Sequence, residues 1–172
     1  KLYHMPIHGF APTSEFTILE HGGTSLTLGL DSSPKTYEMY PFHFRFAIRY
    51  SLEEATLSVT LRVENRDEKP MYFGLGGHPG INVPLEAGLR FEDYRLEFPP
   101  CAPKRVEFTP ECFITGGETP FFLENNTLPL SHELFDADAV VLKGIPGRVT
   151  LRSEKGHRGV TLTAPDFPIF GF

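Results

Sequence analysis

The chain has 172 residues, the length of one ordinary domain, and its net charge of −6 comes from acidic and basic residues that are interspersed. Nucleic acids and anionic membranes bind clustered basic surfaces, and no apolar run reaches bilayer-spanning length, so neither partner is expected. Only two cysteines are present, Cys101 and Cys112, and two free thiols in a reducing compartment such as the cytoplasm are the simplest interpretation.

Short strands are predicted from the beginning of the chain, the first two over Phe16–Leu19 and Ser25–Leu30. Apolar residues then occupy every second position in Phe42–Tyr50 and again in Leu57–Val63, with the short link Ser51–Glu54 between them. A period of two with one apolar side is typical of an antiparallel hairpin that has one buried face and one polar face.

The second half of the chain continues in short strands. A more uniformly apolar strand is expected over Met71–Leu75, and glycine pairs such as Gly116-Gly117 are interpreted as links. No window carries a helical stripe, and sixteen prolines and sixteen glycines suit many short strands. The sequence therefore predicts one all-β, antiparallel sandwich-like domain over residues 1–172, with few or no helices. Its other strands are expected at Tyr94–Phe98, Ala139–Lys143, Arg148–Arg152, Val160–Thr163 and Ile169–Phe172.

Both ends of the sequence look like interior parts of a domain. Phe167, Ile169, Phe170 and Phe172 crowd the last six positions, and an apolar strand that stopped there would leave an exposed edge. Lys1–Phe10 also begins in the middle of a pattern. We therefore expect either that the domain continues beyond both ends or that a partner covers them.

His78 is the leading candidate for chemistry. It follows Gly76-Gly77 and precedes Pro79, so it lies on a shaped turn that a ligand can approach closely. Histidine titrates near neutrality and can serve as a general acid or base. A polar ring is not needed for packing on such a turn, so a chemical role and a structural role are both open.

Other candidates are weaker when each is taken alone. His8, beside Gly9, could also transfer a proton, although a loop histidine commonly just hydrogen-bonds nearby backbone. Asp136 and Asp138 would share a face if they lay on a strand and could bind sugar hydroxyls, but acids at this spacing more often cap a turn. A metal site is weakly indicated, because the chain has no Cys-x-x-Cys and no His-x-His.

The chain resembles the aldose 1-epimerase family, the galactose mutarotase-like group. The resemblance rests on His8-Gly-Phe-Ala11 and on Gly76-Gly-His-Pro-Gly-Ile-Asn82, with Tyr40–Phe44, Val63–Asn65 and Asp136–Leu142 in fitting order. It implies a large antiparallel β-sandwich of the mutarotase type. It also implies interconversion of the α and β anomers of an aldose, without a cofactor.

The resemblance gives each candidate a role. His78 matches the family's acid, which protonates the sugar ring oxygen while a glutamate removes the proton of the anomeric hydroxyl. His8 matches a second histidine that contacts the sugar near the ring oxygen. The sugar-binding aspartate falls at Asp136 or Asp138, and Asn82 falls on a short His-x-x-x-Asn pattern, where it supports the site.

Two of the family's functional residues have no counterpart here. The glutamate base follows the stretch that Phe167–Phe172 resembles, and the sugar-binding arginine precedes the His8-Gly9 segment. Pro12 stands where related bacterial sequences commonly have a basic residue. The resemblance therefore predicts the middle part of a mutarotase-like domain, and the 172 residues alone should be a poor catalyst.

Three functions follow from the sequence. The first is a cytoplasmic isomerase whose partner is a small sugar, an aldohexose with or without a phosphate. The second is a carbohydrate-binding or regulatory β-sandwich that keeps a sugar pocket but does no chemistry. The third is a metal-dependent β-barrel enzyme. The sequence does not indicate the oligomeric state.

Overall fold

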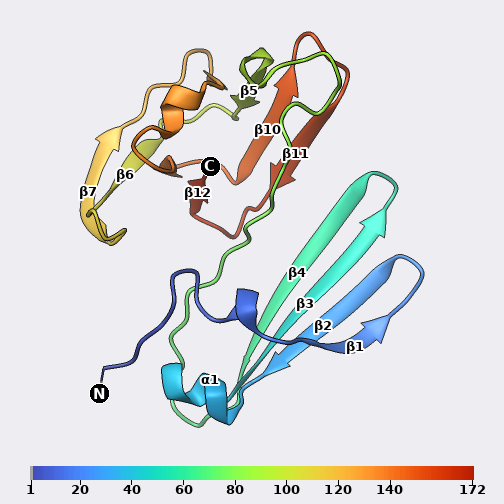
Figure 1. The fold of residues 1–172 in the computed structure, drawn as a ribbon, viewed down its shortest axis with the longest axis vertical. Helices are drawn as coiled ribbons and strands as arrows, with labels where there is room; N and C mark the ends of the chain where they lie inside the picture. Colours follow the sequence, from blue (N-terminus) through green and yellow to red (C-terminus); the bar gives the residue numbers. More distant parts are fainter. Residues whose placement is uncertain (1) are drawn as a thin grey trace. The chain divides into compact units, whose positions relative to one another are not determined.

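Residues 2–172 are described by a computed structural model. The chain divides into two compact units, of which the first ends at Leu75 and the second runs from Gly76 to Phe172. The described residues form three antiparallel four-stranded sheets and one short α-helix (Figure 1). None of their helices has the length and apolar character needed to cross a membrane. The prediction of an antiparallel all-β protein with almost no helix is confirmed.

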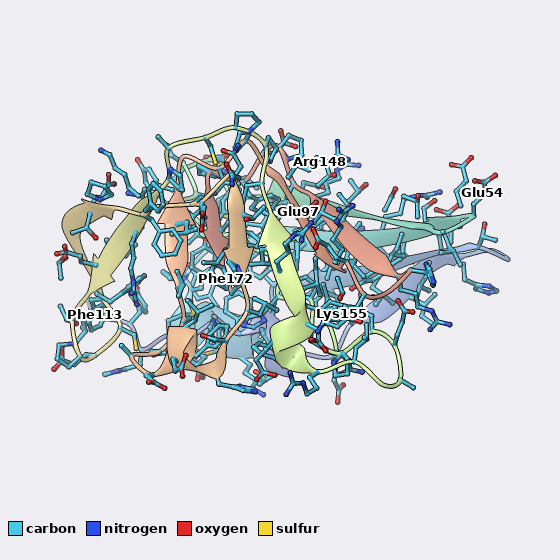
Figure 2. All side chains as sticks on the ribbon, turned by 90° about the horizontal axis from the view of Figure 1, so that it is seen from above. Glu54, Glu97, Phe113, Arg148, Lys155 and Phe172 are labelled. Atoms are coloured by element: carbon cyan, nitrogen blue, oxygen red, sulfur yellow. The ribbon has the colours of Figure 1, made fainter. Side chains whose placement is uncertain are left out.

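The first unit contains one sheet with the strand order β1-β2-β3-β4 (Figure 1). The predicted hairpin is present as β3 and β4, but its turn is shorter than expected. Ser51 pairs with Ser58 and Glu53 with Thr56, so most of the supposed link at residues 51–54 belongs to β3. Glu54 lies at the tip of this hairpin (Figure 2). The bounds are Thr17–His21 for β1, Ser25–Asp31 for β2, Phe44–Glu53 for β3 and Thr56–Asn65 for β4.

The apolar face of the β3–β4 hairpin is covered at one end only. Phe44 is 3% exposed, because rings from outside the sheet pack on it. Toward the turn, Leu57 is 60% exposed and Val59 is 49% exposed. The expectation of a fully buried face is therefore wrong for the turn end of the hairpin in the described residues.

A six-residue helix, α1 (Pro34–Met39), was not predicted from the sequence. Ser33 and Thr36 form a reciprocal capping box at its start, with Pro34 in the first turn. The Tyr40 amide donates to the Thr36 carbonyl at 2.7 Å and closes the helix. A helix this short has no room for an amphipathic stripe, so only its capping residues could have revealed it.

The strand expected at residues 71–75 is absent. Residues 70–82 have no regular secondary structure, and Tyr72 is 80% exposed. An apolar run becomes a strand only where another strand pairs with it, and the glycines and prolines that follow disfavour pairing. The approach to His78 is therefore an irregular segment.

The second unit contains two sheets. One has the order β11-β10-β5-β8 and the other has the order β12-β9-β6-β7. Three strands, β6, β7 and β8, were missed in the sequence, and Gly116-Gly117 lies inside β7 instead of forming a link. The bounds are Tyr94–Glu97 for β5, Lys104–Phe108 for β6, Ile114–Pro120 for β7, Thr127–Pro129 for β8, Val141–Lys143 for β9, Arg148–Ser153 for β10, Gly159–Thr163 for β11 and Ile169–Gly171 for β12.

The main buried cluster of the second unit is formed by residues on or next to β5, β8 and β10 of one sheet. Tyr94 and Leu96 of β5 pack with Leu151 of β10, and the partly buried Phe170 and Phe172 pack against this cluster from the chain's end. Two of the crowded apolar residues at the end of the sequence, Phe170 and Phe172, thus contribute to a core, whereas Ile169 is 43% exposed. Burial of large apolar side chains is the main favourable term in folding, which accounts for their position.

The other face of β5 and β10 is charged. Arg95 and Arg152 are cross-strand neighbours, and the Glu97 carboxylate lies between them, 2.8 Å from Arg95 and 2.9 Å from Arg152 (Glu97 is labelled in Figure 2). Glu154 pairs with Arg95 from the next turn. The alternation of sign offsets the repulsion that two adjacent arginines would otherwise cause.

Candidate functional site

His8 lies at the tight turn that the sequence predicts. The Gly9 amide donates to the Pro6 carbonyl at 2.9 Å, and His8 and Gly9 have φ angles of 65° and 73°. A non-glycine residue in this left-handed region costs about 1 kcal/mol. The His8 side chain is exposed.

The His8 turn is anchored two residues downstream by Phe10. The Phe10 carbonyl accepts hydrogen bonds from the Ser14 hydroxyl at 2.8 Å and from the Thr13 amide at 3.2 Å. Its ring centroid lies 6.0 Å from that of Tyr40 and 5.7 Å from that of Phe44. The segment that presents His8 is therefore tied to an aromatic cluster at the base of the β3–β4 sheet.

His78 and Asn82 are both exposed and share the irregular segment 70–82. The His78 imidazole is therefore not packed in an apolar core. Proton transfer to a bound molecule requires an imidazole that the molecule can reach. Downstream, the Leu85 amide donates to the hydroxyl oxygen of Tyr94 at 2.9 Å, and Tyr94 is almost completely buried. This bond ties the chain just beyond residue 82 to the core of the second unit.

Asp136 and Asp138 lie in a turn between a short 3-10 helix (His132–Phe135) and β9, so they do not share a strand face. Asp138 has a φ of 78°, and its carboxylate accepts a hydrogen bond from the Ala139 amide at 2.7 Å. The Asp136 side chain is exposed, and its carboxylate has no hydrogen bond to the described residues. Only Asp138 therefore shows the capping contact that such acids commonly make.

The candidates fall into separate groups. His8 belongs to the first unit, His78 and Asn82 share one segment of the second, and Asp136 and Asp138 share one turn there. A hollow of about 290 Å³ lies along β10 and β11 and includes none of them. In residues 2–172, no group of three or more His, Cys, Asp or Glu side chains is placed to hold a metal ion, so the metal-dependent alternative gains no support.

Tyr40 is a residue to which the sequence analysis gave no role. Its hydroxyl donates a hydrogen bond to the Tyr72 carbonyl at 2.5 Å, and its ring contacts Phe10. Burial raises the pKa of the Tyr40 hydroxyl. The sequence signal was a tyrosine directly before a proline, between aromatic residues, in a segment that fits the resemblance.

Comparison with known families decides the classification. The family model for aldose 1-epimerase matches residues 1–168. The chain belongs to the aldose 1-epimerase family. Two curated relatives of this family member are the plasmid and chromosomal LacX proteins of Lactococcus lactis subsp. lactis, each 32% identical over 169 residues. The match covers 94% of this chain and 56% of each relative, so the chain spans little more than half of their length.

Solved structures show the same family fold. A galactose mutarotase related enzyme from Lactobacillus acidophilus superposes with a TM-score of 0.89 at 29% identity, covering 99% of this chain and 58% of that one. A galactose mutarotase-like protein from Lactobacillus casei ATCC 334 gives a TM-score of 0.89 at 33% identity, covering 99% and 60%. The resemblance seen in the sequence and the galactose mutarotase-like β-sandwich fold are both confirmed.

Proposed function

We propose that the complete gene product containing residues 1–172 is an aldose 1-epimerase that interconverts the α and β anomers of a free or phosphorylated aldohexose. The observation that carries the proposal is the family match over residues 1–168, which includes both histidine motifs. The exposure of the His8 and His78 side chains supports it, because a substrate must be able to reach them.

The proposed chemistry is acid–base catalysis at the sugar ring. A glutamate carboxylate outside residues 1–172 takes the proton of the anomeric hydroxyl, and the C1–O5 bond breaks as His78 gives its proton to the ring oxygen. The open aldehyde rotates about the C1–C2 bond. Reclosure onto the other carbonyl face returns one proton to His78 and one to the anomeric oxygen, so no proton is gained or lost.

The remaining candidates bind the sugar in this scheme. His8 contacts the substrate near its ring oxygen, an aspartate at 136 or 138 accepts hydrogen bonds from sugar hydroxyls, and Asn82 supports the segment that carries His78. No cofactor takes part. A cytoplasmic location belongs to the same proposal, and the free thiols of Cys101 and Cys112 are consistent with a reducing compartment.

The rival function is a sugar-binding or regulatory module without catalysis. It fits residues 1–172 taken alone, because no glutamate among them matches the base that the resemblance implies. Such a module would bind an aldose through the same groups and leave the rate of anomer exchange unchanged.

Polarimetry of a freshly dissolved α-aldohexose separates the two functions. The complete gene product should accelerate the approach to anomeric equilibrium, and His78→Ala should reduce kcat by about 100-fold or more, because the general acid is lost. The matched control is His21→Ala, which removes an exposed imidazole at the end of β1. Sugar binding without acceleration would establish the module instead, and equal losses in both variants would contradict the role of His78.

A further inference from the structure

We propose that Tyr40 is a positioning residue that holds the two histidine-bearing segments, the His8 turn through its ring and the approach to His78 through its hydroxyl. This inference rests on the proposed epimerase function, and it concerns a residue outside both histidine motifs. All of the contacts that carry it lie within the first unit.

Tyr40 itself is held firmly. Its amide closes α1 by donating to the Thr36 carbonyl at 2.7 Å, and Thr36 is 4% exposed and bonded to Ser33. The Tyr40 ring lies 4.7 Å from Phe42 and 5.8 Å from Phe44, measured between centroids. A side chain fixed by a helix end and two neighbouring rings can fix other segments in turn.

The ring of Tyr40 reaches the His8 segment through Phe10. The centroids of Tyr40 and Phe10 are 6.0 Å apart, a normal separation for interacting aromatic rings. Only Gly9 separates Phe10 from His8, and the Gly9 amide closes the turn that includes His8. A shift of the Phe10 ring therefore moves the base of that turn.

The hydroxyl of Tyr40 reaches the approach to His78 through the Tyr72 carbonyl, at 2.5 Å. The Tyr72 ring is 80% exposed, so the contact restrains the backbone and leaves this ring in solvent. Gly74, Gly76 and Gly77 follow in a segment with no ladder of strand hydrogen bonds. Each glycine widens the range of conformations open to this segment, so the bond at Tyr72 fixes the point from which the approach to His78 departs.

A neighbouring contact strengthens the same restraint. The Lys69 ammonium donates to the Pro41 carbonyl at 3.0 Å and lies 4.6 Å from the centroid of the Phe42 ring. Residues 69–72 are thus held to residues 40–42 at two points. Burial keeps the pKa of Tyr40 above its ordinary value, so the hydroxyl remains a donor throughout the neutral range.

Tyr40→Phe in the complete gene product tests the proposal, because it keeps the ring contacts and removes only the hydroxyl bond to Tyr72. We expect kcat to fall about 10- to 100-fold with KM within about two-fold, since misplacing an acid slows the chemical step more than it weakens binding. The control is Tyr37→Phe, which alters an exposed tyrosine on α1 and should leave both constants unchanged.

Chymotrypsin cleavage supplies a readout independent of activity. Tyr72, Phe73 and Leu75 are exposed cleavage sites in the restrained segment, and Tyr40→Phe should raise their initial cleavage rate several-fold, as measured by mass spectrometry of the fragments. Tyr37→Phe should not. If the wild-type protein has no epimerase activity, the proposed function fails, but the cleavage rates still test the restraint.

Three results would overturn the proposal. One is a Tyr40→Phe variant whose kcat stays within about two-fold of an active wild type. Another is an unchanged cleavage rate at residues 72–75. The third is a Tyr40→Phe variant that fails to fold, as judged by circular dichroism, because Tyr40 would then be a general structural residue.

Discussion

At the scale of single residues, Asp136 and Asp138 differ in how their carboxylates are used. Asp138 binds its neighbour's amide and occupies the left-handed backbone region, whereas the exposed Asp136 carboxylate makes no hydrogen bond to the described residues. A carboxylate already bonded to backbone has less capacity to bind sugar hydroxyls. Asp136 is therefore the better candidate for the sugar-binding aspartate, which the sequence leaves undecided.

We predict that Asp136→Asn raises KM for the aldose by about 10-fold, because a hydrogen bond to a charged group is worth roughly 1.5–3 kcal/mol. Asp138→Asn should leave KM near the wild-type value, since asparagine keeps the acceptor for the Ala139 amide and tolerates a positive φ. Polarimetric rates at several sugar concentrations measure both constants. The reverse pattern would assign the sugar contact to Asp138.

The sequence indicates His8 and His78 as candidates because glycine beside histidine is visible locally. It did not identify Tyr40, because the hydroxyl acts on a carbonyl 32 residues further along the chain. The turn that the sequence favoured for Asp136 and Asp138 is confirmed, since both precede β9, which begins at Val141. A local sequence pattern does not show which residues far apart in the chain come into contact when the protein folds.

At the scale of elements, the turn between β10 and β11 depends on one carboxylate. The amides of His157 and Arg158 both donate to Glu86, each at 2.6 Å. The hydrogen bond from the Arg158 amide is the main cause that lowers the pKa of Glu86 below its ordinary value, and the bond from the His157 amide lowers this pKa further. Partial desolvation of the carboxylate opposes both effects. An acid from residues outside the hairpin thus satisfies donors within its turn.

We predict that acid loosens this turn. Because the folded-state pKa of Glu86 is lowered, its stabilising effect is complete above the ordinary pKa and is lost as pH falls through the lowered value. The protection of the peptide containing residues 156–159, its exchange rate relative to the intrinsic rate at the same pH, should fall over this acidic range in the wild type. In Glu86→Ala this protection should be low already at neutral pH. Glu111→Ala, which removes an exposed acid elsewhere, is the control. Persistent protection in Glu86→Ala would contradict the prediction.

Strands with alternating apolar residues were predicted well, and the exceptions have physical causes. In β7, Gly116-Gly117 resembles a link, yet Glu118 still pairs with Val106 across the sheet. The three-residue β8 is too short to show a period. The apolar segment 71–75 lacks a partner strand among the described residues. Pairing decides strand formation, and local sequence reports it only in part.

At the scale of the whole molecule, the prediction of a single domain is still to be tested. The most informative core residue is Leu142, which is 0% exposed in β9 of the second unit. Leu142→Ala should lower the free energy of unfolding by about 2–5 kcal/mol, because it leaves a cavity in a packed core.

If the chain is one cooperative domain, this loss should appear equally in both units. Urea-dependent hydrogen exchange of peptides from β3 and from β10 measures each unit separately, and Leu142→Ala should lower both midpoints together. Leu52→Ala, at a half-exposed position of β3, should change either midpoint little. A shift confined to the β10 peptide would show that the units unfold independently.

The sequence resemblance extends along the whole chain, so family and fold class could be predicted from it. The glutamate base that the resemblance implies could not be placed, because no glutamate in residues 1–172 matches it. The apolar face of the β3–β4 hairpin is less buried than predicted. Alternation of apolar and polar residues shows which side chains share a face, but it does not show what covers that face.

The backbone at His8 also separates two kinds of damage that mutations cause. At a φ of 65°, glycine or asparagine would fit this turn at least as well as histidine, while a β-branched residue would be strained. Replacing His8 by glycine or asparagine therefore removes the imidazole without adding backbone strain at this turn. Activity lost in those two replacements would therefore report the loss of the imidazole and its contacts, and not strain in the backbone of the turn.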